Sequence, residues 1–214
     1  MSSASDRLPR LVEPAYTAIV TMELQKGIVG DEAILPALSM AVRDAGMLDI
    51  VGRVCRAARG HSVRVLHATM EERHDGAGQS VNCRILALGA KRRRELGHGP
   101  TDIGRPGVAL VDELDYQPSD IRIPRLHGMT PFNGTELDAV MRNLGVRTIV
   151  LMGVSLNLGV TGAALSAVDL GYQVIVVRDA VVGLPKEYAD AMIEHTLSMI
   201  ATIATADELI AAWA

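Results

Sequence analysis

Residues 148–162, TIVLMGVSLNLGVTG, decide the fold of this chain. The first seven residues are almost entirely apolar, which is typical of a strand buried on both faces of a parallel sheet. A turn around Ser155 follows, and residues 157–170 are predicted to form a helix that ends at Gly171. A strand that passes through a turn into a helix is the unit from which α/β folds are built.

Strand and helix patterns alternate along the rest of the chain. Further strands are predicted at 15–22, 62–68, 121–124, 174–177 and 201–204, and further helices at 34–59, 81–96, 135–144, 186–200 and 206–213. This alternation predicts a three-layer αβα fold, Rossmann-like, with a mostly parallel sheet of about six strands and helices on both faces. We expect one domain over residues 15–214, preceded by a loose N-terminal arm at 1–14.

Composition excludes several classes of protein. The 214 residues carry a formal net charge of −4, and 49% are apolar. No apolar run approaches the roughly 18–20 residues of a membrane helix, and the start MSSASDRLPR lacks the apolar stretch of a secretory signal. Cys55 and Cys83 cannot make a disulfide framework. These features predict a cytoplasmic protein without a membrane partner.

Nucleic-acid binding is also disfavoured. Aromatic residues, on which bases stack, make up only 3% of the chain. The basic run at 91–94, KRRR, is predicted to be a solvated helix face rather than a phosphate site.

In parallel sheets, ligands bind beyond the carboxyl ends of the strands. Segments 22–27, 124–133 and 153–160 should therefore converge there. Glu23 directly follows a strand, where a dry cleft would suit it to acid or base catalysis, although it could instead pair with Lys26 at the rim.

Two of these segments offer further candidates with two interpretations each. Arg125 could hold an anionic or carbonyl substrate, or pair with Glu23. His127 could act as an acid or base, but a lone histidine is more often structural, and Phe132 is either a pocket wall or core. Ser155 could be a nucleophile. A role in the turn is favoured, because no candidate base follows it at a spacing typical of a nucleophile motif.

Together these segments resemble the isochorismatase-like hydrolase superfamily, which includes cysteine amidohydrolases such as nicotinamidases, and isochorismatases. The resemblance runs from about Tyr16 to Ala206. The matching motifs are Glu23-Leu24-Gln25, Arg125, Thr130-Pro131-Phe132, Gly134-Thr135-Glu136-Leu137, Gly153-Val154-Ser155-Leu156-Asn157-Leu158-Gly159 and Gly171-Tyr172-Gln173-Val174.

The chain departs from the amidohydrolase pattern at three positions. Glu23 stands for Asp, Arg125 for Lys, and Gly159 for the nucleophilic Cys. Without a thiolate, acyl-enzyme chemistry has no nucleophile at this position, and we expect both Cys55 and Cys83 to be buried instead. Authentic isochorismatases resemble this chain in having glycine there, and they hydrolyse a vinyl ether without a covalent intermediate.

The resemblance implies a site built from four catalytic residues. Glu23 serves as the acid or base, Arg125 orients the substrate, and the N–H groups of Ser155 and Gly159 bind the developing anion, with a cis peptide at Val154–Ser155. The residues expected to bind substrate are Gln25, His127, Met129, Thr130, Phe132, Leu156 and Asn157.

The expected partners are a small-molecule substrate and further copies of the chain, as a homodimer or homotetramer. No cofactor and no metal are expected, because the Asp-x-His metal motif of some relatives is missing from residues 67–74, where only Glu71 and His74 could bind one. The Gly- and Pro-rich loop at 97–107 is placed at a subunit interface or over the site.

Two alternatives to the Cys-independent hydrolase remain open. The chain could be a catalytically silent relative that binds a small molecule or a partner, or an amidohydrolase that uses Ser155, Thr130 or a water activated by Glu23. The scarcity of aromatic residues favours an aliphatic or alicyclic substrate over a flat heteroaromatic one.

Overall fold

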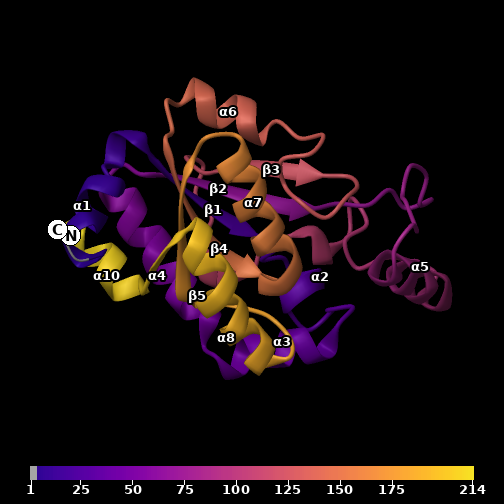
Figure 1. The fold of residues 1–214 in the computed structure, drawn as a ribbon. Coiled ribbons are helices and arrows are strands. Elements are labelled where there is room, and N and C mark those ends of the chain that lie inside the picture. The colour runs from indigo at the N-terminus through magenta and orange to yellow at the C-terminus, as the bar shows by residue number, and fades with distance from the viewer. Residues whose placement is uncertain (1–3) are drawn as a thin grey trace.

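A computed structural model describes residues 4–214 of the chain, and side chains from residue 7 onward. A six-stranded sheet of order β3-β2-β1-β4-β5-β6 runs through the molecule, with every neighbouring pair parallel (Figure 1). The predicted three-layer α/β architecture is confirmed. The strands are β1 Thr17–Met22, β2 Arg64–Met70, β3 Ile121–Arg125, β4 Thr148–Val154, β5 Gln173–Val182 and β6 Thr202–Ala204.

Helices cover both faces of this sheet. The α-helices are α1 Ala4–Leu11, α2 Lys26–Val29, α3 Pro36–Asp44, α4 Met47–Gly60, α5 Arg84–Leu96, α6 Leu137–Asn143, α7 Thr161–Asp169, α8 Lys186–Met192, α9 Ser198–Ile200 and α10 Ala206–Ala211. Short 3-10 helices lie at Pro14–Tyr16, Pro106–Val108 and Asp112–Leu114, and π-helical turns at Leu156–Val160 and Ile193–Leu197.

The central strands β1 and β4 are buried on both faces, as their uninterrupted apolar sequences predict. Because successive side chains of a strand point to opposite faces, each strand feeds two cores. Ile19 and Val150 pack under α1, α3, α4 and α10, whereas Val20 and Leu151 pack under α6, α7 and α8.

The predicted helix over 34–59 is wrong in one respect, because it is two helices. Gly46 separates α3 from α4 with a left-handed φ of 59°, a conformation that glycine adopts without a steric penalty.

The N-terminal segment is also not a loose arm where it is described. Residues 4–11 form α1, and Leu8 and Val12 are buried in the core. The indole Nε1–H of Trp213 donates to the Val12 carbonyl at 2.8 Å, which ties the first helix to the last residues of the chain. Residues 1–3 of the predicted arm lie outside the described residues.

One helix stands apart from the two layers. Figure 1 shows α5 beyond the carboxyl ends of β2 and β3, on the side of the molecule opposite to α1 and α10. None of its residues is fully buried.

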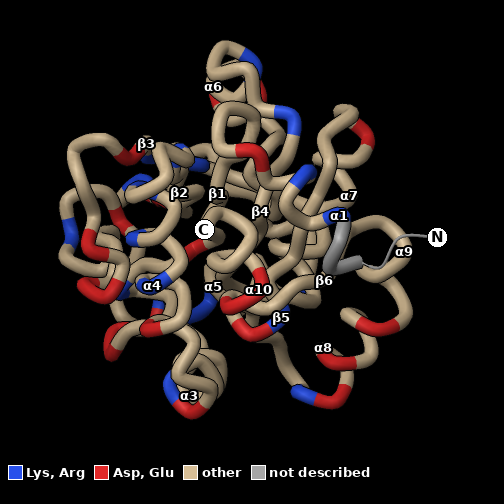
Figure 2. The backbone as a smooth tube through the Cα atoms, turned by 90° about the vertical axis from the view of Figure 1, so that its left-hand side faces the viewer, with Lys and Arg blue, Asp and Glu red and all other residues tan. Residues whose placement is uncertain are grey.

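Within the described residues, no helix has the length and apolar character needed to cross a membrane. In the view of Figure 2, acidic and basic residues are interspersed along the chain, and no broad basic face is visible.

Candidate active site

The three predicted segments do converge at the carboxyl edge of the sheet. Strand order reverses between β1 and β4, which is where open α/β sheets form a ligand crevice. A cavity of about 410 Å³ lies here, and Glu23, Arg125 and Ser155 all line it.

Glu23 is held at the end of β1 in an unusual backbone conformation. Its φ is 55°, in the left-handed region that few residues other than glycine adopt, and its N–H donates to the Ala68 carbonyl of β2 at 2.9 Å. Strain of this kind is found at functional sites, where the surrounding structure enforces it. The carboxylate is 16% exposed and accepts a hydrogen bond from Arg125 Nη2.

Arg125 is the last residue of β3, and its side chain is 3% exposed. Its guanidinium holds Glu23 through Nη2 and donates from Nε to the Gly128 carbonyl at 3.1 Å. Nη1 is buried and has no hydrogen-bond partner among residues 4–214. Because buried polar groups are nearly always paired, this unused donor beside a cavity is a candidate ligand contact.

The turn after β4 supplies backbone donors. The peptide bond between Val154 and Ser155 is cis, as the resemblance implied. Leu158 and Val160 both donate to the Ser155 carbonyl, at 3.2 and 3.1 Å, in a π-helical turn. Among residues 4–214, the N–H of Ser155 has no acceptor, and that of Gly159 has none outside its own helix.

Glycine is required just before this turn. Gly153 has a φ of 115°, and a Cβ there would lie 2.3 Å from the Met22 carbonyl oxygen. This close approach seats the end of β4 directly against the end of β1, and so brings Ser155 and Glu23 to one cavity.

The position of the missing nucleophile is partly filled. A Cβ at Gly159 would lie 3.1 Å from the Met22 methyl carbon, and no cysteine lines the cavity. Cys55 is buried in the core, where desolvation raises its pKa to about 12, so it stays a thiol. Cys83 is exposed at the start of α5, which corrects the expectation that both cysteines are buried.

Of the residues expected to bind substrate, the structure places His127 and Met129 on the cavity wall. Gln25 is not there. It is fully buried, and its amide exchanges hydrogen bonds with the backbone of Met70 at 2.7 and 2.9 Å and donates to the Val108 carbonyl at 3.1 Å. These bonds give it a structural role that fastens the end of β1 to two neighbouring segments.

The other four expected residues also lie away from the cavity. Phe132 and Leu156 pack in the core, and Phe132 lies 6.3 Å from the Tyr172 ring. Thr130 lies against α7, where a Cβ at Gly162 would come within 2.7 Å of its methyl group. Asn157 donates to the Leu184 carbonyl at 3.2 Å and so holds the β5–α8 loop.

The structure adds a wall that the sequence analysis missed. Helix α5 lines the cavity through Ile85, Leu86 and Gly89 among others, and the segment between α2 and α3 also lines it, with Ile34 and Leu35. Ile85, Gly89 and Arg93 are half-buried on one face of α5, but the sequence has no apolar periodicity there, because two of these residues are glycine and arginine.

The basic run at 91–94 is not a single solvated face. Arg93 points inward and pairs with the buried Asp102, whereas Lys91 and Arg92 lie at the cavity rim near Glu95. The loop at 97–107 therefore supports α5 through Asp102.

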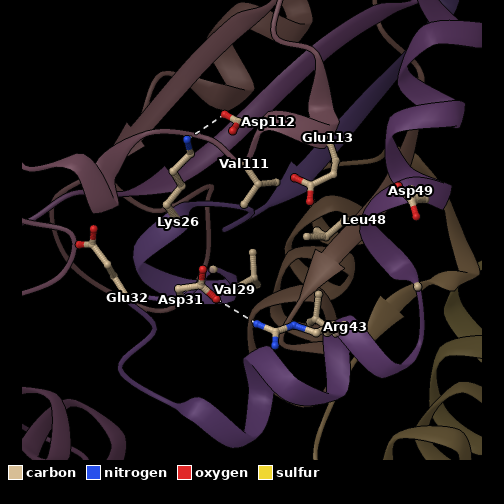
Figure 3. A pocket seen from close by; sticks show the side chains of 13 residues that line it. Lys26, Val29, Asp31, Glu32, Arg43, Leu48, Asp49, Val111, Asp112 and Glu113 are labelled. Carbon is tan, nitrogen blue, oxygen red and sulfur yellow. Dashed lines mark hydrogen bonds and ion pairs between the residues drawn. The ribbon is translucent and has the colours of Figure 1, made fainter.

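A second cavity of about 500 Å³ lies elsewhere, between α2, α3, the start of α4 and residues 111–113 (Figure 3). Its charged side chains are largely paired with one another, as Lys26 with Asp112 at 2.8 Å and Arg43 with Asp31 at 3.0 Å. None of the candidate residues lies in it.

Among the described residues, no cluster of three or more His, Cys, Asp or Glu side chains could hold a metal ion. Glu71 instead pairs with Arg122 at 2.8 Å.

Comparison with known proteins agrees with this geometry. The isochorismatase domain model matches residues 17–208. Ureidoacrylate amidohydrolase RutB of Rhizobium rhizogenes is 28% identical over 179 residues, which cover 80% of this chain and 72% of that protein. An isochorismatase family protein of Desulfovibrio vulgaris superposes with a TM-score of 0.77 at 25% identity, covering 90% of this chain and 95% of that one.

A cysteine hydrolase of Pseudomonas syringae shares the fold, with a TM-score of 0.75 at 18% identity over 95% of this chain and 94% of that one. The family match spans all six strands and all three site segments. The chain therefore belongs to the isochorismatase family of hydrolases.

Proposed function

We propose that this chain hydrolyses a C–O or C–N bond in a small molecule that bears a carbonyl or carboxylate group, by acid/base catalysis without a covalent intermediate. The observation that carries the proposal is the Glu23–Arg125 pair, which lies in the same cavity as Ser155 and Gly159 of the β4–α7 turn, whose N–H groups are candidate donors. The amidohydrolase name of the RutB relatives supports a carbonyl substrate.

Glu23 acts as the base in this proposal. The Arg125 guanidinium holds the Glu23 carboxylate at the cavity wall, where the carboxylate can accept a proton from water. The resulting hydroxide adds to the carbonyl carbon. When the C–O or C–N bond breaks, the protonated Glu23 returns its proton to the leaving group, so that acid and base are the same residue.

The N–H groups of Ser155 and Gly159 hold the oxyanion. They supply preorganised donors where charge develops, and Arg125 Nη1 is a further donor beside them. Arg125 thus has two roles, orienting the base and offering a contact to the substrate.

The body of the substrate is aliphatic or alicyclic. Apart from the imidazole of His127, no aromatic ring lines the cavity among the described residues. Among these residues, a flat heteroaromatic substrate would find only that imidazole to stack on.

A second candidate function is ligand binding without turnover. The Met22 methyl group beside Gly159 favours it, because it fills space where relatives with a cysteine place their nucleophile. A member that had lost its chemistry could keep such packing.

The test is hydrolysis of a panel of small aliphatic esters, amides and vinyl ethers by the unaltered protein, Glu23→Gln and Glu187→Gln. General-base catalysis is worth about 10²–10⁴-fold, so Glu23→Gln should lose that much. Glu187 is an exposed carboxylate on α8 and serves as the matched control. Full activity in Glu23→Gln would overturn the proposal.

The remaining alternatives give different results in the same experiment. Specific binding with no turnover by the unaltered protein supports the silent relative. A covalent adduct with an electrophilic inhibitor, located on Ser155 or Thr130 by mass spectrometry, supports an alternative nucleophile.

A further inference from the structure

Gly89 occupies an unusual position in α5. It lies in the middle of the 13-residue helix and lines the cavity. Glycine is unfavourable in a helix interior because the chain loses more conformational freedom there than it would with alanine. The presence of glycine at this position therefore has to be explained by backbone conformation, packing or function.

Neither backbone conformation nor packing supplies that reason. Gly89 does not have a positive φ, and a Cβ built on it would have no heavy atom within 4 Å. Gly99 makes the contrast, because a Cβ there would lie 2.6 Å from Glu72 Oε2 and 2.7 Å from Asp102 Oδ1. The space beside Gly89 is open, and Gly89 lines the cavity.

The helix around Gly89 is fixed in place. One turn further on, Arg93 Nη1 donates to Asp102 Oδ1 at 2.6 Å, and Nη2 donates to the Arg73 carbonyl at 2.6 Å. The side chains of Arg93 and Asp102 are 14% and 3% exposed. Because the pair is largely shielded from water, it holds α5 as a wall rather than as a free flap.

The part of the cavity beside this wall, here called the chamber, contains a group of aliphatic side chains among its polar ones. Ile85, Leu86 and Leu88 of α5 line it, and Leu158 and Met129 line it from the side of the reacting residues. A linear alkyl group can pack against these aliphatic side chains.

We infer that Gly89 is a specificity-determining residue, and that the absence of its side chain opens the chamber to the alkyl chain of an aliphatic amide. The inference rests on the proposed function for the reacting end of the substrate. The alkyl chain extends from the Glu23 end of the cavity towards α5, and a larger residue at position 89 shortens the chain that fits.

Binding of butanamide, hexanamide and octanamide, measured by titration calorimetry, tests this inference. In the unaltered protein, affinity should rise about three- to fourfold for each added methylene, the value expected for burial of a CH₂ group. Gly89→Leu should keep butanamide affinity within about twofold and weaken octanamide binding at least tenfold, which undoes two or more methylene steps.

Ala87→Leu is the matched control, because Ala87 lies two residues away on the exposed face of the same helix and does not line the cavity. It should leave the chain-length profile unchanged. Equal weakening at all chain lengths by Gly89→Leu, the same effect from Ala87→Leu, or no chain-length dependence in the unaltered protein would each overturn the inference.

The Gly89→Ala variant controls for a loss of binding that is caused by misfolding of Gly89→Leu. It should raise the melting temperature through helix propensity and still reduce octanamide affinity more than butanamide affinity. The chain-length profile is measured in Glu23→Gln as well. A profile that persists there, with no hydrolysis by any form of the protein, rejects the proposed function and leaves the binding inference standing.

Discussion

The Arg125 guanidinium joins two elements that lie on either side of β2. It projects from the end of β3, donates from Nη2 to Glu23 at the end of β1, and is fixed from behind by the Gly128 carbonyl at 3.1 Å. A planar fork can make both contacts at once, whereas a lysine ammonium is a single point charge on a flexible stem.

Arg125→Lys should therefore keep the positive charge but lose the contacts that fix the orientation of Glu23. A hydrogen bond to a charged group is worth about 1.5–3 kcal/mol, so kcat/KM should fall about 10- to 100-fold on the substrate found in the panel. Arg122→Lys is the control, since Arg122 lies on the same strand and pairs with Glu71 away from the cavity. Equal losses in both variants would contradict the assignment.

Catalysis should not depend on either cysteine. Desolvation holds the pKa of Cys55 near 12, so in the native protein iodoacetamide should label Cys83 alone at pH 8. Mass spectrometry locates the label, and the labelled protein should keep its full rate of hydrolysis. A thiol mechanism would be indicated instead if activity fell in step with labelling and the Cys83→Ala variant had also lost its activity.

Loss of Arg93 should loosen α5. Arg93→Met removes the pair with Asp102 and leaves that carboxylate buried without its cation, a loss that typically costs about 3–5 kcal/mol for a buried pair. Limited trypsin digestion should then cut within residues 84–96 faster than in the unaltered protein. Arg94→Met, on the exposed side of the helix, should digest at the unaltered rate.

A buried ionic network predicts how stability depends on pH. Burial alone would raise the pKa of Asp120, but hydrogen bonds from His67, Arg59 and the Gln117 N–H outweigh it and hold the pKa well below its usual value. A depressed carboxyl pKa stabilises the fold above the unfolded value of about 4 and loses that contribution as pH falls below it.

The free energy of unfolding, measured in urea, should thus decrease as pH is lowered from 5 to 3. Asp120→Asn should be less stable at pH 7 by about 3 kcal/mol, the scale for breaking a buried pair, and should show a shallower decrease between pH 5 and 3. A parallel pH dependence in both proteins would show that Asp120 is not its source.

All six strands could be predicted from local sequence, and most are apolar runs, with β3 (IRIPR) the exception. Only the prediction for β5 was much too short, because it covered residues 174–177 whereas the strand runs over Gln173–Val182. Its second half contains Arg178 and Asp179 and looks like a loop, yet it pairs with β4 past an irregularity between Leu151 and Gly153. That pairing is a tertiary effect with no local signal.

The candidate site likewise contains residues that could be placed from the sequence and residues that could not. Residues placed directly at strand ends, Glu23, Arg125 and Ser155, reach the cavity as predicted from topology alone. Gln25 does not, because its partners Met70 and Val108 are 45 and 83 residues away in the chain. The α5 wall was missed because its anchor, Arg93, looks like part of a solvated basic run. A homodimer or homotetramer stays a prediction.

The bond between Trp213 and Val12 also bears on how the protein can be handled. It gathers α1 and the C-terminal residues at one end of the molecule, and α5 stands at the other (Figure 1). A matrix that grips the chain by its C-terminus would hold it at the end opposite to α5, which forms one wall of the cavity. Tethering on a sensor surface or a flow column is thus compatible with access to the site.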